Sequence, residues 1–382
     1  MISDVPLGAF LSGGIDSGAV VAMMSRLSDE PVNTFCIGFG GEVGGYLDER
    51  RYAQEIATRY RTKHREYVVK PSVKEILGEI VQSFDEPFGD PSTIPSYYVS
   101  KITRERVKVA LSGLGGDELF GGYERYLGFS LSRTYNLLPL FLRESVIRKL
   151  LEALPERADG HYTVSHLKRF ARSASLSDPS RYFSFSSIIR EEVRRSLFSD
   201  HDRFALSFDN CRDLLISHFN RCKAKDPMDR VYYCDLKTYV PEDILACTDR
   251  MSMWHSLEVR VPFLDHHLVE FCATIPNSLK IKFLQKKYIL KKALSPVLPR
   301  SVLNHRKQGF IGPMTRWLQT DLKNYVQSGL RPQRLAEHGL FSQRTVKTIL
   351  YEHFSRKENN DKLIWSLIMF QEWYEHYIGK RV

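Results

Sequence analysis

Residues 6 to 27 constrain the fold most, because an apolar run, a turn of small residues and a helical pattern follow one another directly. The apolar run reads PLGAFL, the turn is Ser12-Gly13-Gly14, and the helical pattern starts at Ile15. Glycine lets a backbone approach an anion closely, serine hydroxyls donate hydrogen bonds, and a helix N-terminus presents unpaired N–H groups. The stretch therefore predicts a phosphate-binding turn, although a turn that only caps a helix would have the same sequence.

The first third of the chain alternates short apolar segments with helical patterns. The expected strands are 6–11, 32–39, 66–69 and 107–111, and the expected helices are 15–27, 49–60, 73–83 and 94–103. Short strands that alternate with helices of about ten residues or more indicate βαβ units and a mostly parallel sheet. Ligands of such sheets bind at the carboxyl ends of the strands.

After about residue 129 the strand signals stop, and helical spacing continues with interruptions by proline and glycine. The predicted fold class is therefore α/β, a parallel sheet with flanking helices, followed by a mainly α-helical part. We place the α/β domain at 1–130 and the helical part at 131–382.

A second turn of small residues, in ALSGLGGDE from Ala110, again follows an apolar run. Its Asp117 and the Asp16 of the first turn would supply two carboxylates at neighbouring strand ends. Carboxylate oxygens are ligands that Mg²⁺ prefers. The two acids could equally cap helices.

Composition limits the partners. The net charge of +10 suits anionic ligands such as nucleotides, but the basic residues are dispersed along the chain, so we expect no nucleic-acid partner. No apolar run approaches about 20 residues and no secretory leader is recognisable, so we expect a cytoplasmic protein without a membrane partner. The six cysteines are widely spaced and show no zinc pattern, which favours reduced thiols.

Several long motifs resemble one family. VPLGAFLSGGIDS resembles the PP-loop of ATP pyrophosphatases, which cleave ATP to AMP and pyrophosphate. With ALSGLGGDELFGGYERY, DRMSMWHSLEVRVPFLDHHLVEF and HRKQGF, it makes essentially the whole chain similar to the synthetase domain of glutamine-dependent asparagine synthetase. The resemblance implies an adenine nucleotide α-hydrolase-like fold that uses ATP and Mg²⁺. It also implies an amide ligase of the amidotransferase type, which adenylates a carboxylate, most readily aspartate, and transfers ammonia to it to give asparagine.

The resemblance also implies site residues. ATP would be held by a set of strand-end and turn residues: Leu11, Ser12, Gly13, Gly14, Asp16, Ser17, Ile37, Ser112 and Gly113. Leu11 and Ile37 would hold the adenine through their backbone. Lys287, in KKYILKK, would stabilise charge on the phosphate, with a surface lysine on a basic helix as the alternative. Asp16 and Asp117 would be the metal ligands and act in catalysis beside Lys287, and Arg306 and Lys307 would be further phosphate contacts.

Two positions depart from the family pattern. Gly18 stands where the family has serine or threonine after SGGxDS, so one hydroxyl donor is absent. Leu114 stands where family members that make asparagine often have an acid, so general-base help to ammonia is lost there unless Glu118 or Glu124 substitutes. An amide ligase or cyclase for a specialised or cell-surface metabolite, and a nucleotide-binding protein without turnover, are therefore alternatives.

The expected partners follow from the same resemblance. The family's N-terminal glutaminase domain, with its nucleophilic cysteine, is absent from this sequence. We therefore expect a fragment of a longer protein, or a chain that works with ammonia or a separate glutaminase subunit. The sequence leaves the oligomeric state open, a homodimer included.

Overall fold

The computed structural model describes residues 1–40, 49–69, 72–155, 163–199, 201–305, 309–310 and 312–379, with the side chains of 201–209 left out. The chain divides into two compact units. Unit 1 comprises 1–83, 92–123 and 238–312, and unit 2 comprises 84–91, 124–237 and 313–382. Unit 1 thus joins most of the predicted α/β segment to a later stretch of chain, and the domain boundary at residue 130 stays a prediction.

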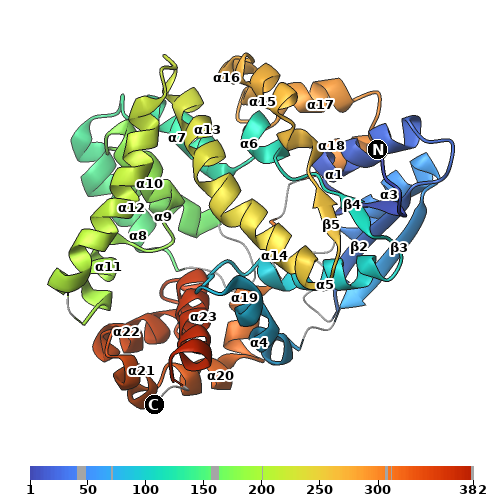
Figure 1. Cartoon of the computed structure of the whole chain (residues 1–382). Helices are drawn as coiled ribbons and strands as arrows, with labels where there is room; N and C mark the ends of the chain where they lie inside the picture. Colours follow the sequence, from blue (N-terminus) through green and yellow to red (C-terminus); the bar gives the residue numbers. More distant parts are fainter. Residues whose placement is uncertain are drawn as a thin grey trace. The chain divides into compact units, whose positions relative to one another are not determined.

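Unit 1 is built on a five-stranded sheet in the order β3-β2-β1-β4-β5, in which every neighbouring pair is parallel (Figure 1). The strands are β1 (Leu7–Phe10), β2 (Asn33–Phe39), β3 (Lys63–Val69), β4 (Val109–Leu111) and β5 (Glu258–Arg260). The α/β fold class with a parallel sheet is confirmed.

β1 lies between β2 and β4, and this position determines which loops meet. Gly8 pairs with Asn33 on one side and with Ala110 on the other. Because all three strands run in the same direction, the turns after β1 and β4 leave the same edge of the sheet. The two Ser-Gly turns are therefore neighbours at the carboxyl ends, where ligands of such sheets bind.

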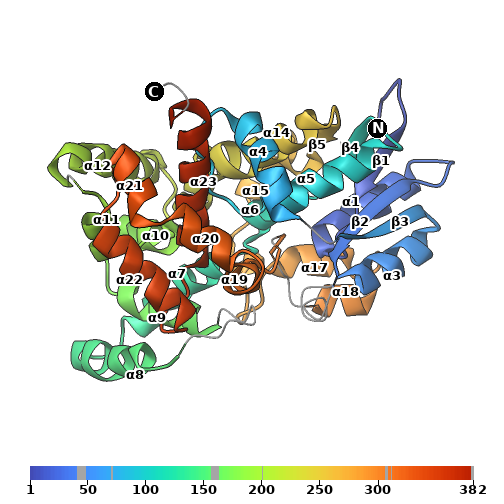
Figure 2. The same cartoon turned by 90° about the horizontal axis from the view of Figure 1, so that it is seen from below.

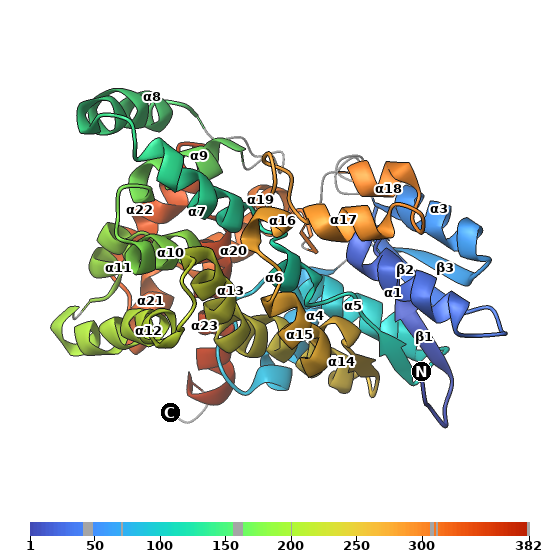
Figure 3. The ribbon, with the colours of Figure 1, turned by 90° about the horizontal axis from the view of Figure 1, so that it is seen from above.

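Helices cover both faces of this sheet. α1 and α3 pack together on one face and α5 and α14 on the other (Figure 2). α17 and α18 lie beside α1 and α3 (Figure 3). Tyr60 OH, at the end of α3, donates to Val297 O, between α17 and α18, at 2.8 Å. The helical elements of unit 1 are α1 (Ile15–Arg26), α3 (Arg50–Tyr60), α4 (Val73–Phe84, whose last residue falls in unit 2), α5 (Thr93–Arg104), α6 (Gly116–Phe120), η2 (Val240–Leu245), α14 (Ala246–Trp254), η3 (Pro262–Leu264), α15 (His266–Ala273), α16 (Asn277–Lys280), α17 (Tyr288–Leu294) and α18 (Arg300–Asn304).

β5 is a correction to the expectation that strands end near residue 129. It has three residues, of which Glu258 and Arg260 are charged, so no apolar alternation marks it in the sequence. Its place comes from its neighbours: Leu257 is fully buried with Ala110 and Phe35, and Val259 packs against the same cluster. Tertiary packing, which a local pattern does not contain, determines this strand.

Unit 2 is helical, as the sequence predicts for the later part of the chain. Its helices are α7 (Glu124–Tyr135), η1 (Leu142–Ile147), α8 (Arg148–Glu152), α9 (Thr163–Ser173), α10 (Asp178–Ser186), α11 (Glu191–Leu197), α12 (His201–Arg221), α13 (Pro227–Lys237), α19 (Met314–Gln319), α20 (Lys323–Gly329), α21 (Pro332–His338), α22 (Gln343–Phe354) and α23 (Asp361–Tyr377). No helix among the described residues is both long enough and apolar enough to cross a membrane.

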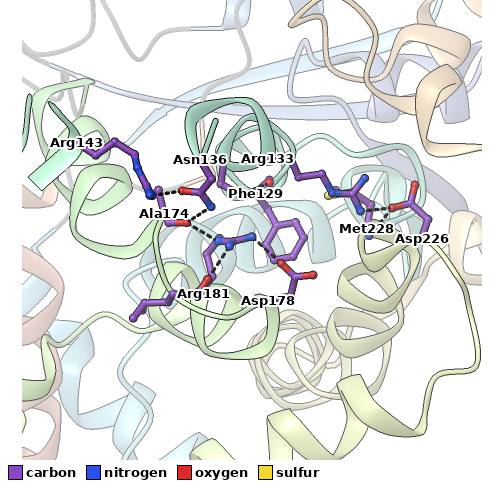
Figure 4. A network of polar contacts seen from close by, with 11 residues as sticks. Phe129, Arg133, Asn136, Arg143, Ala174, Asp178, Arg181, Asp226 and Met228 are labelled. Atoms are coloured by element: carbon purple, nitrogen blue, oxygen red, sulfur yellow. Dashed lines mark hydrogen bonds and ion pairs between the residues drawn. The ribbon is translucent and has the colours of Figure 1, made fainter. Parts of the chain in front are cut away.

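A buried arginine joins α7, α9 and α10 of unit 2 (Figure 4). The Arg181 guanidinium donates to Ala174 O at 3.0 Å, to Leu176 O at 2.6 Å and to Asp178 Oδ1 at 2.7 Å. It also lies 5.3 Å from the centre of the Phe129 ring. Burial lowers the pKa of Arg181, and the Asp178 carboxylate opposes that shift. The charge is retained because several acceptors surround it.

Candidate active site

The turn between β1 and α1 is held by hydroxyl contacts inside it. Ser12 Oγ lies 3.0 Å from Ser17 Oγ and accepts the N–H of Gly14 at 3.3 Å. Gly13 has a φ of 88°, and a Cβ there would lie 2.5 Å from the carbonyl oxygen of Glu49, so only glycine fits. The N-cap residue of α1 is Gly14, which has no side chain to cap the helix. Side-chain capping therefore does not explain this turn.

Gly18 stands where the family pattern has a serine or threonine, and its surroundings explain the glycine. A Cβ at Gly18 would lie 2.9 Å from Ile56 Cδ1 and 3.2 Å from Leu298 Cδ2. The space that a serine or threonine side chain would need is taken by two apolar side chains from α3 and the segment before α18. Glycine at this position thus belongs to the packing of α1 on its neighbours.

The second turn, between β4 and α6, touches the first. Ser112 N donates to Arg260 O of β5 at 2.8 Å, which fixes the start of the turn. A Cβ at Gly113 would lie 2.5 Å from Ser17 N and 2.7 Å from the carbonyl carbon of Asp16. The backbone of the second turn can approach the start of α1 only because residue 113 is glycine.

Asp16, Asp117 and Lys287 meet where the two turns touch. Lys287 Nζ forms an ion pair with Asp16 Oδ2 and lies 2.7 Å from Asp117 Oδ1. The three side chains are 6 to 15% exposed. Each acid lies in the first turn of its helix, but the N-cap residues are Gly14 and Gly115. The acids thus face a shared cation and do not serve as N-caps.

Lys287 differs from the other lysines of its motif. It is 5% exposed, precedes α17 with a left-handed φ of 54°, and turns its amine into the site. Lys292, in α17, is exposed. The pKa of Lys291 is lowered by burial and further by the positive charges of Lys286 and Lys287. The alternative of a surface lysine does not describe Lys287.

Two glycines that sequence reasoning did not select line this cluster. A Cβ at Gly116 would lie 2.4 Å from Asp16 Oδ1, and a Cβ at Gly122 would lie 1.8 Å from Asp117 Oδ1 and 2.4 Å from Lys287 Cε. Any side chain at either position would collide with a charged group of the site. The signal was present in the sequence as the paired glycines of GGDELFGG.

The donor set fits a divalent cation. Asp16 Oδ1 is buried and has no hydrogen-bond partner, so one carboxylate oxygen is available beside the second acid. Within the part of the chain that the structure describes, no cluster of three or more His, Cys, Asp or Glu side chains offers a complete metal cage. Two carboxylates suit Mg²⁺, which takes its other ligands from phosphates and water.

Leu11 and Ile37, the residues predicted to hold adenine, lie at the same edge of the sheet. Leu11 is fully buried, and its N–H donates to Phe35 O of β2 at 2.8 Å. Ile37 lies two residues further along β2, is partly buried and pairs with Tyr67 of β3. Arg306 and Lys307 lie outside the described residues.

Comparison with known proteins shows which family the sequence matches. The family model described as asparagine synthase matches residues 1–375. The chain is 34% identical over all of its length to "Asparagine synthetase [glutamine-hydrolyzing] 1" of Bacillus subtilis, of which it covers 58%. It is 33% identical over its whole length to a "Putative asparagine synthetase [glutamine-hydrolyzing]" of Mycobacterium tuberculosis, of which it covers 56%.

A more distant relative has a different name. Over 82% of this chain and 50% of the relative, the identity to "Amidase chry2" of Gibberella zeae is 28%. The chain thus spans somewhat more than half the length of the synthetases that it matches.

Proposed function

This chain belongs to the asparagine synthase family, and on that basis we propose that it is the ATP-dependent, AMP-forming ligase part of an amidotransferase. A substrate carboxylate oxygen attacks the α-phosphorus of ATP, and pyrophosphate leaves. Ammonia then attacks the acyl carbon, loses a proton and displaces AMP, so that an amide forms. The leading acceptor is aspartate and the leading product is asparagine.

The observation that carries this proposal is the meeting of two glycine turns around one lysine and two acids. Gly113 packs on the backbone of Asp16 and Ser17, and the Lys287 amine contacts both Asp16 and Asp117. Three glycines, Gly113, Gly116 and Gly122, pack so closely on these residues that a Cβ at any of them would collide with Asp16, Asp117 or Lys287. Glycine turns at the start of a helix bring backbone N–H groups close to a bound anion, which favours a phosphate ligand.

In this proposal the first turn holds the phosphates. Ser12, Gly13, Gly14 and Ser17 offer N–H and hydroxyl donors at the start of α1. The second turn, at Ser112 and Gly113, closes on the nucleotide from β4. The backbone near Leu11 and Ile37 contacts the adenine at the ends of β1 and β2.

The charged groups would act on the phosphates. Asp16 and Asp117 would hold Mg²⁺, which when bound offsets negative charge on the phosphate oxygens. Lys287, which forms ion pairs with those acids, would turn its amine toward the phosphate as negative charge develops. Adenylation requires only such positioning and charge stabilisation.

The partners follow from the relatives. The names of the Bacillus and Mycobacterium synthetases state that they hydrolyse glutamine. We propose that a glutaminase domain or subunit supplies ammonia to this chain, and that the reaction takes place in the cytoplasm. Neither a nucleic acid nor a membrane is required by this chemistry.

A second candidate is an amide ligase for a different acceptor acid. The observation in its favour is Leu114, a half-buried leucine in the second turn that cannot accept a proton from the amine. The same position would also permit a protein that binds ATP without turnover.

One assay separates these functions. ATP–[³²P]pyrophosphate exchange should require Mg²⁺ and a carboxylic acid, and a panel of acids that includes aspartate identifies the acceptor. Asp16→Asn should abolish exchange, whereas Lys292→Met, which changes an exposed lysine of α17, should not. Exchange with aspartate supports the leading function, and exchange only with another acid supports the second. Exchange that persists in Asp16→Asn would overturn the proposed site.

A further inference from the structure

The residue after Asp117 carries a second, fully buried carboxylate. Glu118 lies in α6 and is 1% exposed. Its Oε1 accepts a hydrogen bond from the hydroxyl of Tyr123 at 2.5 Å. Burial of a carboxylate is costly unless donors surround it, so this hydrogen bond contributes to keeping Glu118 inside the fold.

Two hydrogen bonds, one of the backbone and one of side chains, bridge the turn that follows α6. Gly121 ends α6 with a left-handed φ of 70°, and Gly122 N donates to Asp117 O at 2.8 Å. The Tyr123–Glu118 hydrogen bond closes the same turn through side chains. Together the two bonds fix the path of the chain immediately after α6.

The turn at Gly121 and Gly122 lies against the side chains of Asp117 and Lys287. The α-carbon of Gly122 lies so close to Asp117 and Lys287 that a Cβ would overlap Asp117 Oδ1 and reach within 2.4 Å of Lys287 Cε. The backbone at Gly122 thus packs directly against the side chains of Asp117 and Lys287.

A further contact supports the tyrosine. The ring of Tyr123 meets the ring of Tyr239 edge to face, with 5.8 Å between centroids and 80° between planes. Tyr239 immediately precedes η2, a π-helical segment that contains Pro241. Such segments occur often at functional sites. Tyr123 thus has one side against Tyr239 and its hydroxyl on Glu118.

We propose that Tyr123 and Glu118 are positioning residues for adenylation, whose hydrogen bond holds Gly122 against Asp117 and Lys287. The reaction named here rests on the proposed function, whereas the packing itself needs no nucleotide. Glu118 then does not replace the acid that is absent at Leu114, because its carboxylate is buried and already accepts the Tyr123 hydroxyl.

Tyr123→Phe tests the pair, because it removes one hydroxyl and keeps the ring beside Tyr239. Tyr97→Phe is the matched control: Tyr97 is buried and its OH donates to Glu79 Oε2 at 2.7 Å, so it makes a second Tyr–Glu bond of unit 1, between α5 and α4. The first measurement is the rate at which a small acylating reagent labels Lys287, followed by peptide mass spectrometry without ATP. The second is Mg²⁺-dependent pyrophosphate exchange with its kcat and KM for ATP.

We expect Tyr123→Phe to raise Lys287 labelling several-fold and to lower kcat by about 10- to 100-fold, the usual cost of losing a supporting hydrogen bond behind reactive groups. KM for ATP should change less than kcat, since the turns that bind the nucleotide are untouched. Adding Glu118→Gln to Tyr123→Phe should restore much of the slow labelling, because a neutral amide tolerates burial without the hydroxyl better than a carboxylate does.

The outcomes separate the two proposals. Labelling and kcat of Tyr123→Phe equal to those of Tyr97→Phe would overturn the positioning role. Absence of exchange in the wild-type chain with every acid would count against the proposed function, and the labelling rates would still decide whether the pair holds Lys287.

Discussion

Lys287 and Asp117 lie 2.7 Å apart, amine nitrogen to carboxylate oxygen, and the same amine contacts Asp16. One cation thus neutralises two buried acids that come from the first turns of different helices. Because those acids are also the proposed Mg²⁺ ligands, the lysine holds the place of a counter-ion between them. Removing the Lys287 charge should therefore change both the stability of the site and its binding of Mg²⁺.

The first prediction removes the lysine charge. Lys287→Met should lower the free energy of unfolding by about 3 kcal/mol, because two buried carboxylates lose their cation. Mg²⁺ should then stabilise this variant more than the wild type, since the carboxylates no longer share a lysine. Urea unfolding with and without Mg²⁺ measures both effects. Lys292→Met, on the exposed side of α17, is the control, and an equal loss in the two variants would contradict the prediction.

The second prediction tests the room around the acids. In Gly116→Ala the new Cβ would lie 2.4 Å from Asp16 Oδ1, so the carboxylate must move. We expect Mg·ATP affinity, measured by calorimetry, to fall at least tenfold. Gly78→Ala in α4 is the control, because a Cβ there meets nothing within 4 Å. That control should be stabilised by about 0.4–1 kcal/mol and bind normally. Unchanged affinity in Gly116→Ala would show that the acids are not needed at this spacing.

The sequence was informative where structure is local. Ser12, Gly13 and Gly14 lie between an apolar run that forms a strand and a segment that forms a helix, and the predicted elements of unit 1 appear close to the expected positions. Asp16 and Asp117 could be paired in advance because carboxyl ends of parallel strands meet at one edge.

Other features depend on distant contacts and had no local signal. β5 has three residues and is placed by packing of Leu257 and Val259 on the sheet. Lys287 could not be distinguished from its neighbours in KKYILKK by pattern alone; its left-handed φ and buried amine set it apart, whereas sequence reasoning depended on a family resemblance. The Tyr123–Glu118 bond joins two ordinary polar residues and becomes visible only with coordinates.

The third prediction concerns the buried arginine of unit 2. Arg181→Met should destabilise α9 and α10 by about 3 kcal/mol, because Leu176 O and Asp178 lose a buried charged donor. Arg133→Met is the control: its guanidinium lies 3.0 Å from Asp226, but its side chain is 50% exposed, so the loss should stay below about 1 kcal/mol. Hydrogen exchange of peptides from α9 and α10 reports both values. Similar protection in the two variants would contradict this account.

The fourth prediction is a pH dependence of stability in unit 2. Burial lowers the pKa of His353, and the nearby Asp361 carboxylate opposes that shift. Its Nδ1 accepts the N–H of Asn360 at 3.3 Å, and its buried Nε2 has no hydrogen-bond partner. The folded chain therefore takes up a proton on this ring less readily than the unfolded chain does. The contribution of the neutral His353 ring to the free energy of unfolding is fully present above about pH 6.5, the pKa in the unfolded chain. It is lost as the pH falls from there to the lowered pKa of the folded chain.

Replacing the ring isolates its contribution. His353→Gln should reduce the slope of unfolding free energy against pH between about 7 and 5.5, by no more than about 1.4 kcal/mol per pH unit. Hydrogen exchange of α22 and α23 peptides at several pH values measures that slope, and peptides of unit 1 should keep theirs. An unchanged slope in α22 would mean that this histidine is protonated equally in both states.

The fifth prediction concerns the residue that departs most from the family pattern. Leu114 is half-buried in the second turn, two residues after Ser112 and three before Asp117, so a longer acidic side chain can be accommodated at the edge of the site. If ammonia must lose a proton there, Leu114→Glu should raise the rate of ammonia-dependent amide formation by about 10²-fold, the lower end for a general base, and leave pyrophosphate exchange unchanged. Leu114→Gln has nearly the same shape without the base and should give no increase. A rise in both variants would point to packing instead of proton transfer, and no rise in either would mean that the natural amine reaches the acyl-adenylate already neutral.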